Sequence, residues 1–451
     1  MKKCLLLGVA AAISPCIFAA AKADDPQILR MANPISPEGE FLSDPAPRVG
    51  PDGVLRLFGS RDEGNGSKYC SQFNDIYETR DFSAWTVRKG VLASCGESDG
   101  VPGTDAPLYA PDGIFINGVW ALFYCTPDRQ CTEGVAVADK PEGPYRSLYS
   151  YPWARQIDPS VFMDDDGRVY YTFGQFDMKI AELKPDLSGM VPGTLRGNVI
   201  NERQHGFHEG SQLVKRGGTY YLVYTDISRR GRPTAIGYST AKSPYGPYTR
   251  RGVIIDNFGC DPRSWNNHGG IVEFGGKWFV FYHRSTNGTK SLRKPCVEPI
   301  EFDANGLIAE VEQTSNGAGP LLDPFADTPA RLACLMSGNA RIVTEKDGLE
   351  HLAGIRAGDT ATWRYFNFRT SAAHLRLRVA SLHGGRVELR DGEGSVYGSV
   401  KIPAGDGKTE SVVEMPLTRP FPSGRRAVKL VFADGDRKGG DLFSLKAFRF
   451  K

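Results

Sequence analysis

The chain has 451 residues, more than one compact core usually holds, so we expect two domains. Hydrophobic residues make up 40% of the chain and charged residues 24%, a composition that excludes general disorder. The 55 basic and 52 acidic residues leave a net charge of +3, too balanced for a protein whose partner is nucleic acid.

The N-terminus has the pattern of a secretory signal. Met1-Lys2-Lys3 is a positive head, and the short apolar run that follows leads to Ala21-Lys22-Ala23, a small-x-small cleavage pattern. The run is too short for a membrane anchor. We therefore predict a signal peptide at 1–23, a mature chain from Asp24, a secreted or periplasmic location and no membrane partner.

Seven of the nine cysteines remain after such a cleavage. An oxidising compartment would allow disulfides, with a connectivity that spacing leaves open. The candidates are Cys70, Cys95, Cys125, Cys131, Cys260 and Cys296. Cys334 is then the odd one, and the lack of a CxxC motif disfavours a metal cluster or thiol redox chemistry.

The residue pattern from about Asn33 to Ile308 predicts strands and turns almost throughout. Ile157 to Gly174 gives its basic unit, a short strand, a tight Asp-Gly turn and an aromatic strand. Related units contain Asp44, Tyr109, Glu209 and Asn267, which makes five repeats in all. Repeats of about 45 to 70 residues with about four strands each predict an all-β, five-bladed β-propeller over 24–325.

Three acids share one register in these repeats. Each lies nine positions before a turn glycine: Asp44 before Gly53, Asp158 before Gly167 and Glu209 before Gly218. The innermost strand of each propeller blade meets the axis, so equivalent positions converge. We expect the three carboxyl groups to face one pocket, although Asp-Pro is also a common turn opener and a Glu-Gly pair could lie in a solvated loop.

A second β-rich segment follows at 335–451, after a Gly- and Pro-rich exit from the propeller. Alternating stretches such as Leu375-Arg376-Leu377-Arg378-Val379 and Arg386-Val387-Glu388-Leu389-Arg390 predict strands, and the chain ends on another. A small antiparallel, jelly-roll-like β-sandwich is the natural interpretation.

Two aspartates and a glutamate on converging strands suit glycoside hydrolysis with inversion. One carboxylic acid protonates the leaving oxygen, and a carboxylate about 6.5 to 9.5 Å away activates water. A third charge can raise the pKa of the acid.

The motifs resemble those of glycoside hydrolase family 43, the five-bladed propeller enzymes that remove arabinofuranose, xylose or galactose units. Ser43-Asp44-Pro45 matches the motif of the general base, Ile157-Asp158-Pro159-Ser160 that of the pKa-modulating aspartate, and His208-Glu209-Gly210 that of the general acid. The resemblance implies an inverting single displacement in which Asp44 is the base, Glu209 the acid and Asp158 the residue that tunes Glu209.

The same resemblance extends to the substrate pocket. Tyr109-Ala110-Pro111-Asp112 is similar to the second-blade motif and Arg293 to a substrate-reaching arginine, so Tyr109, Asp112 and Arg293 are expected to bind substrate. Phe41 and Trp265 are candidate sugar-stacking aromatics, with a place in the propeller core as the alternative. Asn267-His268-Gly269 implies a calcium ion on the axis, linked to His268 through water, or else a hydrogen-bonded structural histidine. No organic cofactor is expected.

The C-terminal segment resembles a family 6 carbohydrate-binding module in its strand order and its Asp441-Leu442-Phe443-Ser444-Leu445 ending. The stretch from Ala404 to Glu410 lacks the tryptophan typical of binding members. Sugar binding and a purely structural sandwich docked on the propeller both remain open.

We therefore predict a secreted, inverting exo-glycoside hydrolase that acts on polysaccharide side chains as a monomer and releases α-L-arabinofuranose. The alternatives within the family are a β-xylosidase and a β-galactosidase or galactofuranosidase. A retaining fructan enzyme of the same fold typically has Cys after its glutamate, whereas Gly210 follows Glu209 here. A non-catalytic glycan-binding propeller is disfavoured because all three acids are present.

Overall fold

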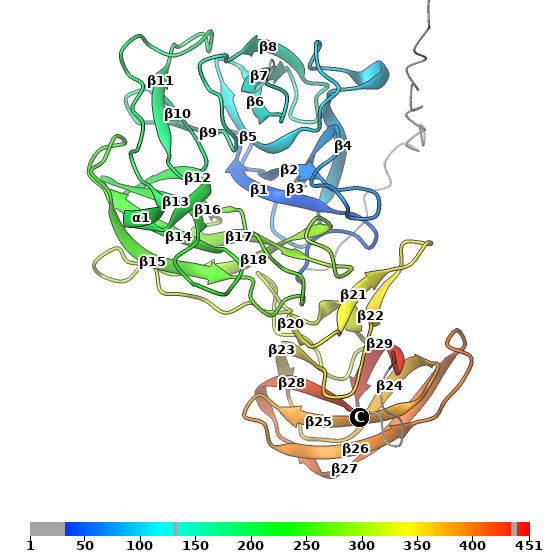
Figure 1. The fold of residues 1–451 in the computed structure, drawn as a ribbon. Helices are drawn as coiled ribbons and strands as arrows, with labels where there is room; N and C mark the ends of the chain where they lie inside the picture. The colour runs from blue at the N-terminus through cyan, green and yellow to red at the C-terminus, as the bar shows by residue number, and fades with distance from the viewer. Residues whose placement is uncertain (1–31, 130–132, 434–439) are drawn as a thin grey trace, which may run out of the picture.

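The structure, a computed structural model, describes residues 32–129, 133–433 and 440–451. The predicted signal peptide and Cys131 lie outside these residues. Five small sheets surround a common axis, and a two-sheet sandwich lies beside them (Figure 1). The predicted all-β fold, a propeller followed by a sandwich, is confirmed. The helical elements of the described part are the short α1 (Glu202–His205), η1 (Gly96–Ser98) and η2 (Ala330–Leu332), and none of its helices could cross a membrane.

Three of the five sheets, here called blades I, II and IV, have four antiparallel strands each. Blade I contains β1 (Leu42–Val49), β2 (Leu55–Arg61), β3 (Phe73–Thr79) and β4 (Thr86–Ala93). Blade II contains β5 (Tyr109–Ile116), β6 (Val119–Cys125), β7 (Glu133–Ala138) and β8 (Arg146–Ser150). Blade IV contains β12 (Phe207–Arg216), β13 (Thr219–Asp226), β14 (Ala235–Ala241) and β15 (Thr249–Asp256). Their second strands read as continuous buried runs because neighbouring blades cover both faces, whereas the outer β8 alternates with solvent.

Blades III and V have three strands each, which corrects the expectation of about four in every repeat. Blade III contains β9 (Ser160–Met163), β10 (Val169–Phe173) and β11 (Lys179–Leu183), and blade V contains β16 (Gly270–Phe274), β17 (Lys277–Ser285) and β18 (Arg293–Ile300). Isolated bridges to Met190 and Arg196 take the outer place in blade III. The fourth edge is thus supplied by irregular segments that satisfy backbone groups without forming a full strand.

The ring of blades is closed by the residues that directly precede β1. The innermost strands contact one another in the cycle β1, β5, β9, β12, β16 and back to β1. Beside β18, the Ile35 amide donates to the Pro295 carbonyl at 2.9 Å, and the Asn33 side chain accepts from the Val297 amide at 2.9 Å and donates to its carbonyl at 3.1 Å. Residues just before the first blade therefore fasten onto the last one.

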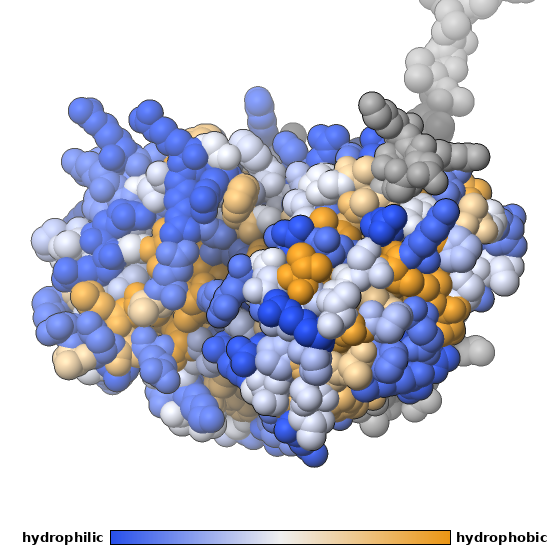
Figure 2. All heavy atoms as spheres, turned by 90° about the horizontal axis from the view of Figure 1, so that it is seen from below, coloured by the Kyte–Doolittle hydropathy of each residue, from blue (hydrophilic) through white to orange (hydrophobic). Residues whose placement is uncertain are grey.

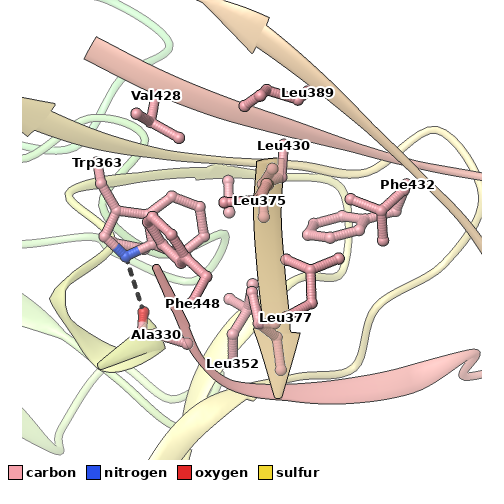
Figure 3. Packing of buried hydrophobic residues seen from close by; sticks show 14 of the residues in the cluster. Ala330, Leu352, Trp363, Leu375, Leu377, Leu389, Val428, Leu430, Phe432 and Phe448 are labelled. Carbon is pink, nitrogen blue, oxygen red and sulfur yellow. Dashed lines mark hydrogen bonds between the residues drawn. The ribbon is translucent and has the colours of Figure 1, made fainter. Parts of the chain in front are cut away.

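The sandwich packs a six-stranded sheet on a five-stranded one. The six-stranded sheet contains β19 (Thr328–Pro329), β21 (Arg341–Thr344), β22 (Glu350–Ala353), β24 (Ala372–Ser381), β27 (Glu410–Phe421) and β29 (Phe443–Phe450). The five-stranded sheet contains β20 (Leu335–Ser337), β23 (Thr360–Phe368), β25 (Gly385–Asp391), β26 (Val396–Ile402) and β28 (Gly424–Ala433). Figure 3 shows the core between them, where Trp363 packs edge-on against Phe448 with ring centroids 4.8 Å apart and donates its indole N–H to the Ala330 carbonyl at 3.2 Å.

Buried polar contacts join the sandwich to blade V. Arg284 of β17 donates to the Ala333 carbonyl at 2.7 Å. The Lys294 ammonium of β18 lies 2.5 Å from the Glu350 carboxylate of β22, and both side chains are almost fully buried. Glu350 also accepts from the Gly39 amide at 3.0 Å, so it reaches the segment that leads into β1. The outer surface of the sandwich side, unlike this buried contact, shows hydrophilic side chains that alternate with separate apolar patches (Figure 2).

The cysteines correct the predicted disulfides. Cys70, Cys125, Cys260, Cys296 and Cys334 are free thiols, so no bridge joins any two of these five. Cys125, Cys260, Cys296 and Cys334 are buried, and a buried cysteine behaves as a small apolar residue. A pairing that involves Cys131 falls outside the described residues.

We expect Glu350→Gln to destabilise the contact between propeller and sandwich. The substitution leaves the Lys294 ammonium buried without a counter-charge, which typically costs about 3–5 kcal/mol. Calorimetry should show a lower melting temperature and earlier inactivation on heating.

The double variant Lys294→Met with Glu350→Leu is the control, because it removes both charges and should recover most of the loss. A single variant as stable as the parent would contradict the importance of this pair.

Candidate active site

The three register-matched acids lie where innermost strands bend at the axis. Asp44 is in β1, Asp158 lies two residues before β9 begins and Glu209 is in β12. Asp44 and Asp158 have left-handed backbones with φ of 54° and 62°, and the pairing register of β1 and of β12 shifts at the acid. Such bulges redirect a side chain out of the regular alternation of a strand. The local backbone thus aims each carboxyl group away from its blade.

Asp44 is a buried carboxylate with strong partners. Its Oδ1 accepts from Arg293 Nη1 at 2.7 Å, its Oδ2 accepts from the Ser60 hydroxyl at 3.0 Å, and its amide donates to His283 Nδ1 at 3.1 Å. Burial alone would raise the pKa of Asp44, but the charge of Arg293, helped by the hydrogen bond from Ser60, outweighs burial and lowers this pKa to about 2. Asp44 is therefore ionised throughout the neutral range.

Arg293 forms the wall behind Asp44. Its side chain is only 2% exposed. Its Nε and Nη2 donate to the two oxygens of Asp62 at 2.8 Å each, and Nη2 also lies 3.4 Å from the Cys70 sulfur. Most of its donors are thus engaged within the protein, so Arg293 positions Asp44, and its predicted contact with substrate stays a prediction.

Asp158 lies close to both of the other acids. Its amide donates to the Cys125 sulfur at 3.3 Å. Burial and then the charges of Glu209 and Asp44 raise its pKa well above the usual range for an aspartate. Like charges in one buried cluster cannot all ionise, so this group of acids retains a proton.

Glu209 is the most accessible of the three. Its side chain is 16% exposed, against 7% and 8% for Asp44 and Asp158. Gln175 Nε2 donates to Glu209 Oε2 at 2.7 Å, and His208 Nε2 lies 3.9 Å from the same oxygen. The amide of Gln175 fixes one carboxyl oxygen and leaves the other for a ligand.

His268 lies between the acids. Its Nδ1 is 3.7 Å from Asp44 Oδ1 and 3.8 Å from Asp158 Oδ2, and burial lowers its pKa, which favours the neutral ring. A Cβ on Gly210 would come within 2.8 Å of His268 Nε2, and Gly210 has a φ of 59°. Only glycine suits this position, which gives a physical reason for the glycine after Glu209.

The axis beside His268 offers little to a metal ion by itself. Within the described residues, no group of three His, Cys, Asp or Glu side chains could hold one. The adjoining cavity, lined by Ser160, Gln212 and His268 among others, leaves about 10 Å³ for the centre of a water molecule. That is about enough for one water, so protein ligands alone do not form a calcium cage here.

Asp112 is buried among side chains of three blades. It is 2% exposed, and its carboxylate forms an ion pair with Arg48 and accepts from the Ser160 hydroxyl at 2.7 Å and the Val161 amide at 3.0 Å. Asp112 ties blades I, II and III together, because buried carboxylates need such partners. Its predicted contact with substrate stays a prediction.

The predicted aromatic residues differ in exposure. Tyr109 is half-buried, and burial, with smaller contributions from the nearby Cys70 and Cys125, raises its pKa. Phe41 is half-buried against the Lys294 ammonium, 5.0 Å from its ring centroid. Trp265 is 54% exposed, with the Lys290 ammonium 4.8 Å from its ring. Their stacking on sugar stays a prediction.

Sequence reasoning missed Asp62, Gln175, His208 and His283. Asp62 accepts hydrogen bonds from Arg293, and Gln175 donates one to Glu209. Burial lowers the pKa of His283 to about 3, so its neutral ring can accept a hydrogen bond from the Asp44 amide. His208 was available as the neighbour of Glu209 in one motif. The others stand in ordinary strand or turn sequence that carries no local signal.

Known proteins match this chain along most of its length. A family model described as "Glycosyl hydrolases family 43" matches residues 44–308, and one described as "Carbohydrate binding module (family 6)" matches residues 333–451. A "Xylosidase/arabinosidase" of Thermoclostridium stercorarium is 28% identical, with 92% of this chain and 98% of that protein covered.

Two solved structures show the same fold. An arabinoxylan arabinofuranohydrolase of family 43 from Bacillus subtilis, in complex with cellotetraose, has a TM-score of 0.54 at 24% identity and covers 94% of this chain and 99% of its own. A β-xylosidase/α-arabinofuranosidase from a compost microbial metagenome, in a calcium-free form with xylotriose, has a TM-score of 0.53 at 26% identity and covers 64% and 98%.

We expect Arg293→Met, combined with Asp62→Asn so that no unpaired carboxylate remains, to raise the pKa of Asp44. An adjacent opposite charge lowers a carboxyl pKa by about 1–3 units. If the ionised Asp44 is required for turnover, activity is lost as the pH falls through its pKa, so the acid limb of kcat/KM should move upward by about 1–3 pH units.

Arg293→Lys is the matched variant, because it keeps a positive charge and should move the limb less. An unchanged acid limb in a folded double variant would show that Arg293 does not set the ionisation of Asp44.

Proposed function

The chain belongs to glycosyl hydrolase family 43, and on that basis we propose that it is an inverting exo-glycoside hydrolase that releases α-L-arabinofuranose from polysaccharide side chains. The observation that carries this proposal is the contrast among the three converging acids. Asp44 is buried and ionised, Asp158 has a raised pKa, and Glu209 is the most open. Relatives named for arabinosidase or arabinofuranohydrolase activity support the choice of sugar.

The surroundings of each acid suit one step of a single displacement. Asp44, held ionised by Arg293, accepts a proton from the water that attacks the anomeric carbon. Glu209, on the more open side, donates a proton to the leaving oxygen. Asp158 and Glu209 share the proton that the cluster retains, because the negative charges of the three acids oppose one another. Glu209 is the member of this pair that faces the leaving oxygen. After one turnover the base has gained a proton and the acid has lost one, and exchange with solvent restores both.

A β-xylosidase is the second candidate, since other relatives and a structural neighbour are named for that activity. Both activities remove a terminal five-carbon sugar and need the same three acids, so the difference lies in pocket residues. We also propose that residues 1–23 direct export, as the sequence predicts, and that the protein acts on oligo- or polysaccharide as a monomer.

We expect Glu209→Gln to reduce turnover of oligosaccharides by at least about 10²-fold, because the amide cannot protonate the leaving oxygen. Aryl arabinofuranosides with acidic leaving groups should lose less, since they need little protonation. Release of arabinose and xylose is the measurement, and NMR of the first-formed anomer reports inversion.

A substitution at Trp265, such as Trp265→Phe, is a useful comparison because it leaves all three acids in place. Retained anomeric configuration, or no hydrolysis of arabinofuranosides and xylosides by a folded parent, would contradict the proposed function. Unchanged affinity for sugar with no turnover would favour a glycan-binding propeller.

We propose further that a calcium ion binds on the axis and that water links it to His268. A neighbouring structure described as calcium-free supports calcium as the ion to test. A ligand that binds only the folded state stabilises it in proportion to the logarithm of its concentration. Calorimetry should therefore show a melting temperature that rises with added calcium and falls with a chelator, and magnesium is the control. Equal melting temperatures in calcium and chelator would contradict an axial calcium.

A further inference from the structure

A second hollow borders the catalytic cluster. It has a volume of about 310 Å³ and lies between the segment that follows β6 and the segment that precedes β9, with Arg129 on one side and Arg155, Gln156 and Ile157 on the other. Ile157 is the residue before Asp158. The hollow is therefore adjacent to the catalytic cluster along the chain.

Hydrogen bonds place this hollow on the side of Glu209. Gln156 Oε1 accepts from the Gln175 amide at 2.8 Å, and the Gln175 side chain in turn donates to Glu209 Oε2 at 2.7 Å. An acid that protonates the leaving oxygen must face the part of the substrate that departs. A hollow beside that acid is consequently the place for the leaving portion of the chain.

The charge of the hollow is positive and uncompensated. Arg129 and Arg155 are both exposed, and within the part of the chain that the structure describes neither has a carboxylate within 4.0 Å. The Nε of Arg155 donates to the Pro152 carbonyl at 2.9 Å, which leaves its Nη groups available. The nearby Asp128 carboxylate accepts from the Thr104 hydroxyl at 2.7 Å.

Three arginines that line the interior of the propeller are paired with aspartates. Arg48 pairs with Asp112, Arg61 with Asp75 and Arg293 with Asp62, so their forks are occupied. A planar guanidinium matches a carboxylate with two parallel hydrogen bonds. Two such groups with free donors at the edge of a sugar-cleaving site favour an acidic ligand.

We propose that this hollow binds the carboxylate of a uronic acid carried by the leaving portion of the polysaccharide. The inference rests on the proposed function, because it assigns the hollow to the leaving side of the same reaction. Arg129 and Arg155 set a preference for acidic substrates, while the three acids carry out the chemistry.

The test compares one substrate in two forms, an arabinofuranosylated oligosaccharide with a uronic acid on its leaving chain and the same molecule after reduction of the carboxyl group to an alcohol. The parent protein should have a higher kcat/KM for the acidic form, and added salt should narrow the difference. Arg129→Gln and Arg155→Gln should each lower the acidic-to-neutral ratio of kcat/KM about fivefold, the upper range for an exposed ion pair.

Arg146→Gln is the matched control. Arg146 is also exposed, its guanidinium donates to the carbonyls of Ser98 and Tyr145, and it lies on the outer strand β8. It should leave the ratio unchanged. A parent ratio near one, or a ratio that neither Arg129→Gln nor Arg155→Gln alters, would overturn the proposal, whereas failure of the parent to hydrolyse even aryl arabinofuranosides and xylosides would overturn the proposed function instead.

Discussion

The site depends on one buried cation, the guanidinium of Arg293. A carboxylate that is taken out of water normally takes up a proton, because burial disfavours the charged form. Asp44 is buried and yet ionised because Arg293 lies 2.7 Å from it, and Asp62 holds that arginine with two further hydrogen bonds. Without this arrangement the deepest acid of the cluster would be neutral and could not act as a base.

The Arg293 contact is also a consequence of ring closure. Arg293 opens β18 in the last blade, and Asp44 is in β1 of the first. Arg293 and Asp44 meet because the innermost strands form a closed cycle. Asn33 and Ile35 also fasten the segment before β1 onto β18. Blade closure therefore does more than bury apolar surface, since it brings together the cation and the carboxylate that one strand alone cannot supply.

The sandwich reaches the same place from outside. Lys294, the neighbour of Arg293 in β18, is buried against Glu350 of β22, and Glu350 also accepts from the Gly39 amide ahead of β1. One carboxylate of the second domain thus contacts β18, which carries the counter-charge, and the segment that leads into β1, which carries the base. This structural role follows from the contacts alone and does not require the sandwich to bind sugar.

The sequence predicted the parts of this structure that repeat. Turn glycines at a fixed distance from an acid, followed by aromatic strands, identified the blades and the three carboxyl groups, since each signal is local and occurs several times. The contacts that tune the acids are not local: Asp62 and Arg293 are 231 residues apart, and Gln175 meets Glu209 from another blade. The partner of Asp112 is not local either, because its carboxylate forms an ion pair with Arg48 of another blade. Cysteine spacing likewise does not show which part of the fold buries each thiol.

Three acids of similar chemistry differ in role because their surroundings differ. A base next to a fixed cation loses its proton at low pH and keeps its charge, so Asp44 can accept a proton only from a group that is itself becoming more acidic, such as an attacking water. Among the described residues, Asp158 has no cation in hydrogen-bond contact and lies close to two other acids, so it shares with Glu209 the proton that the cluster retains. Glu209 has one oxygen fixed by an amide and the larger exposed fraction, which is what a donor to a departing group requires. The three roles therefore follow from three surroundings: a neighbouring cation for Asp44, neighbouring acids for Asp158 and access to the substrate for Glu209.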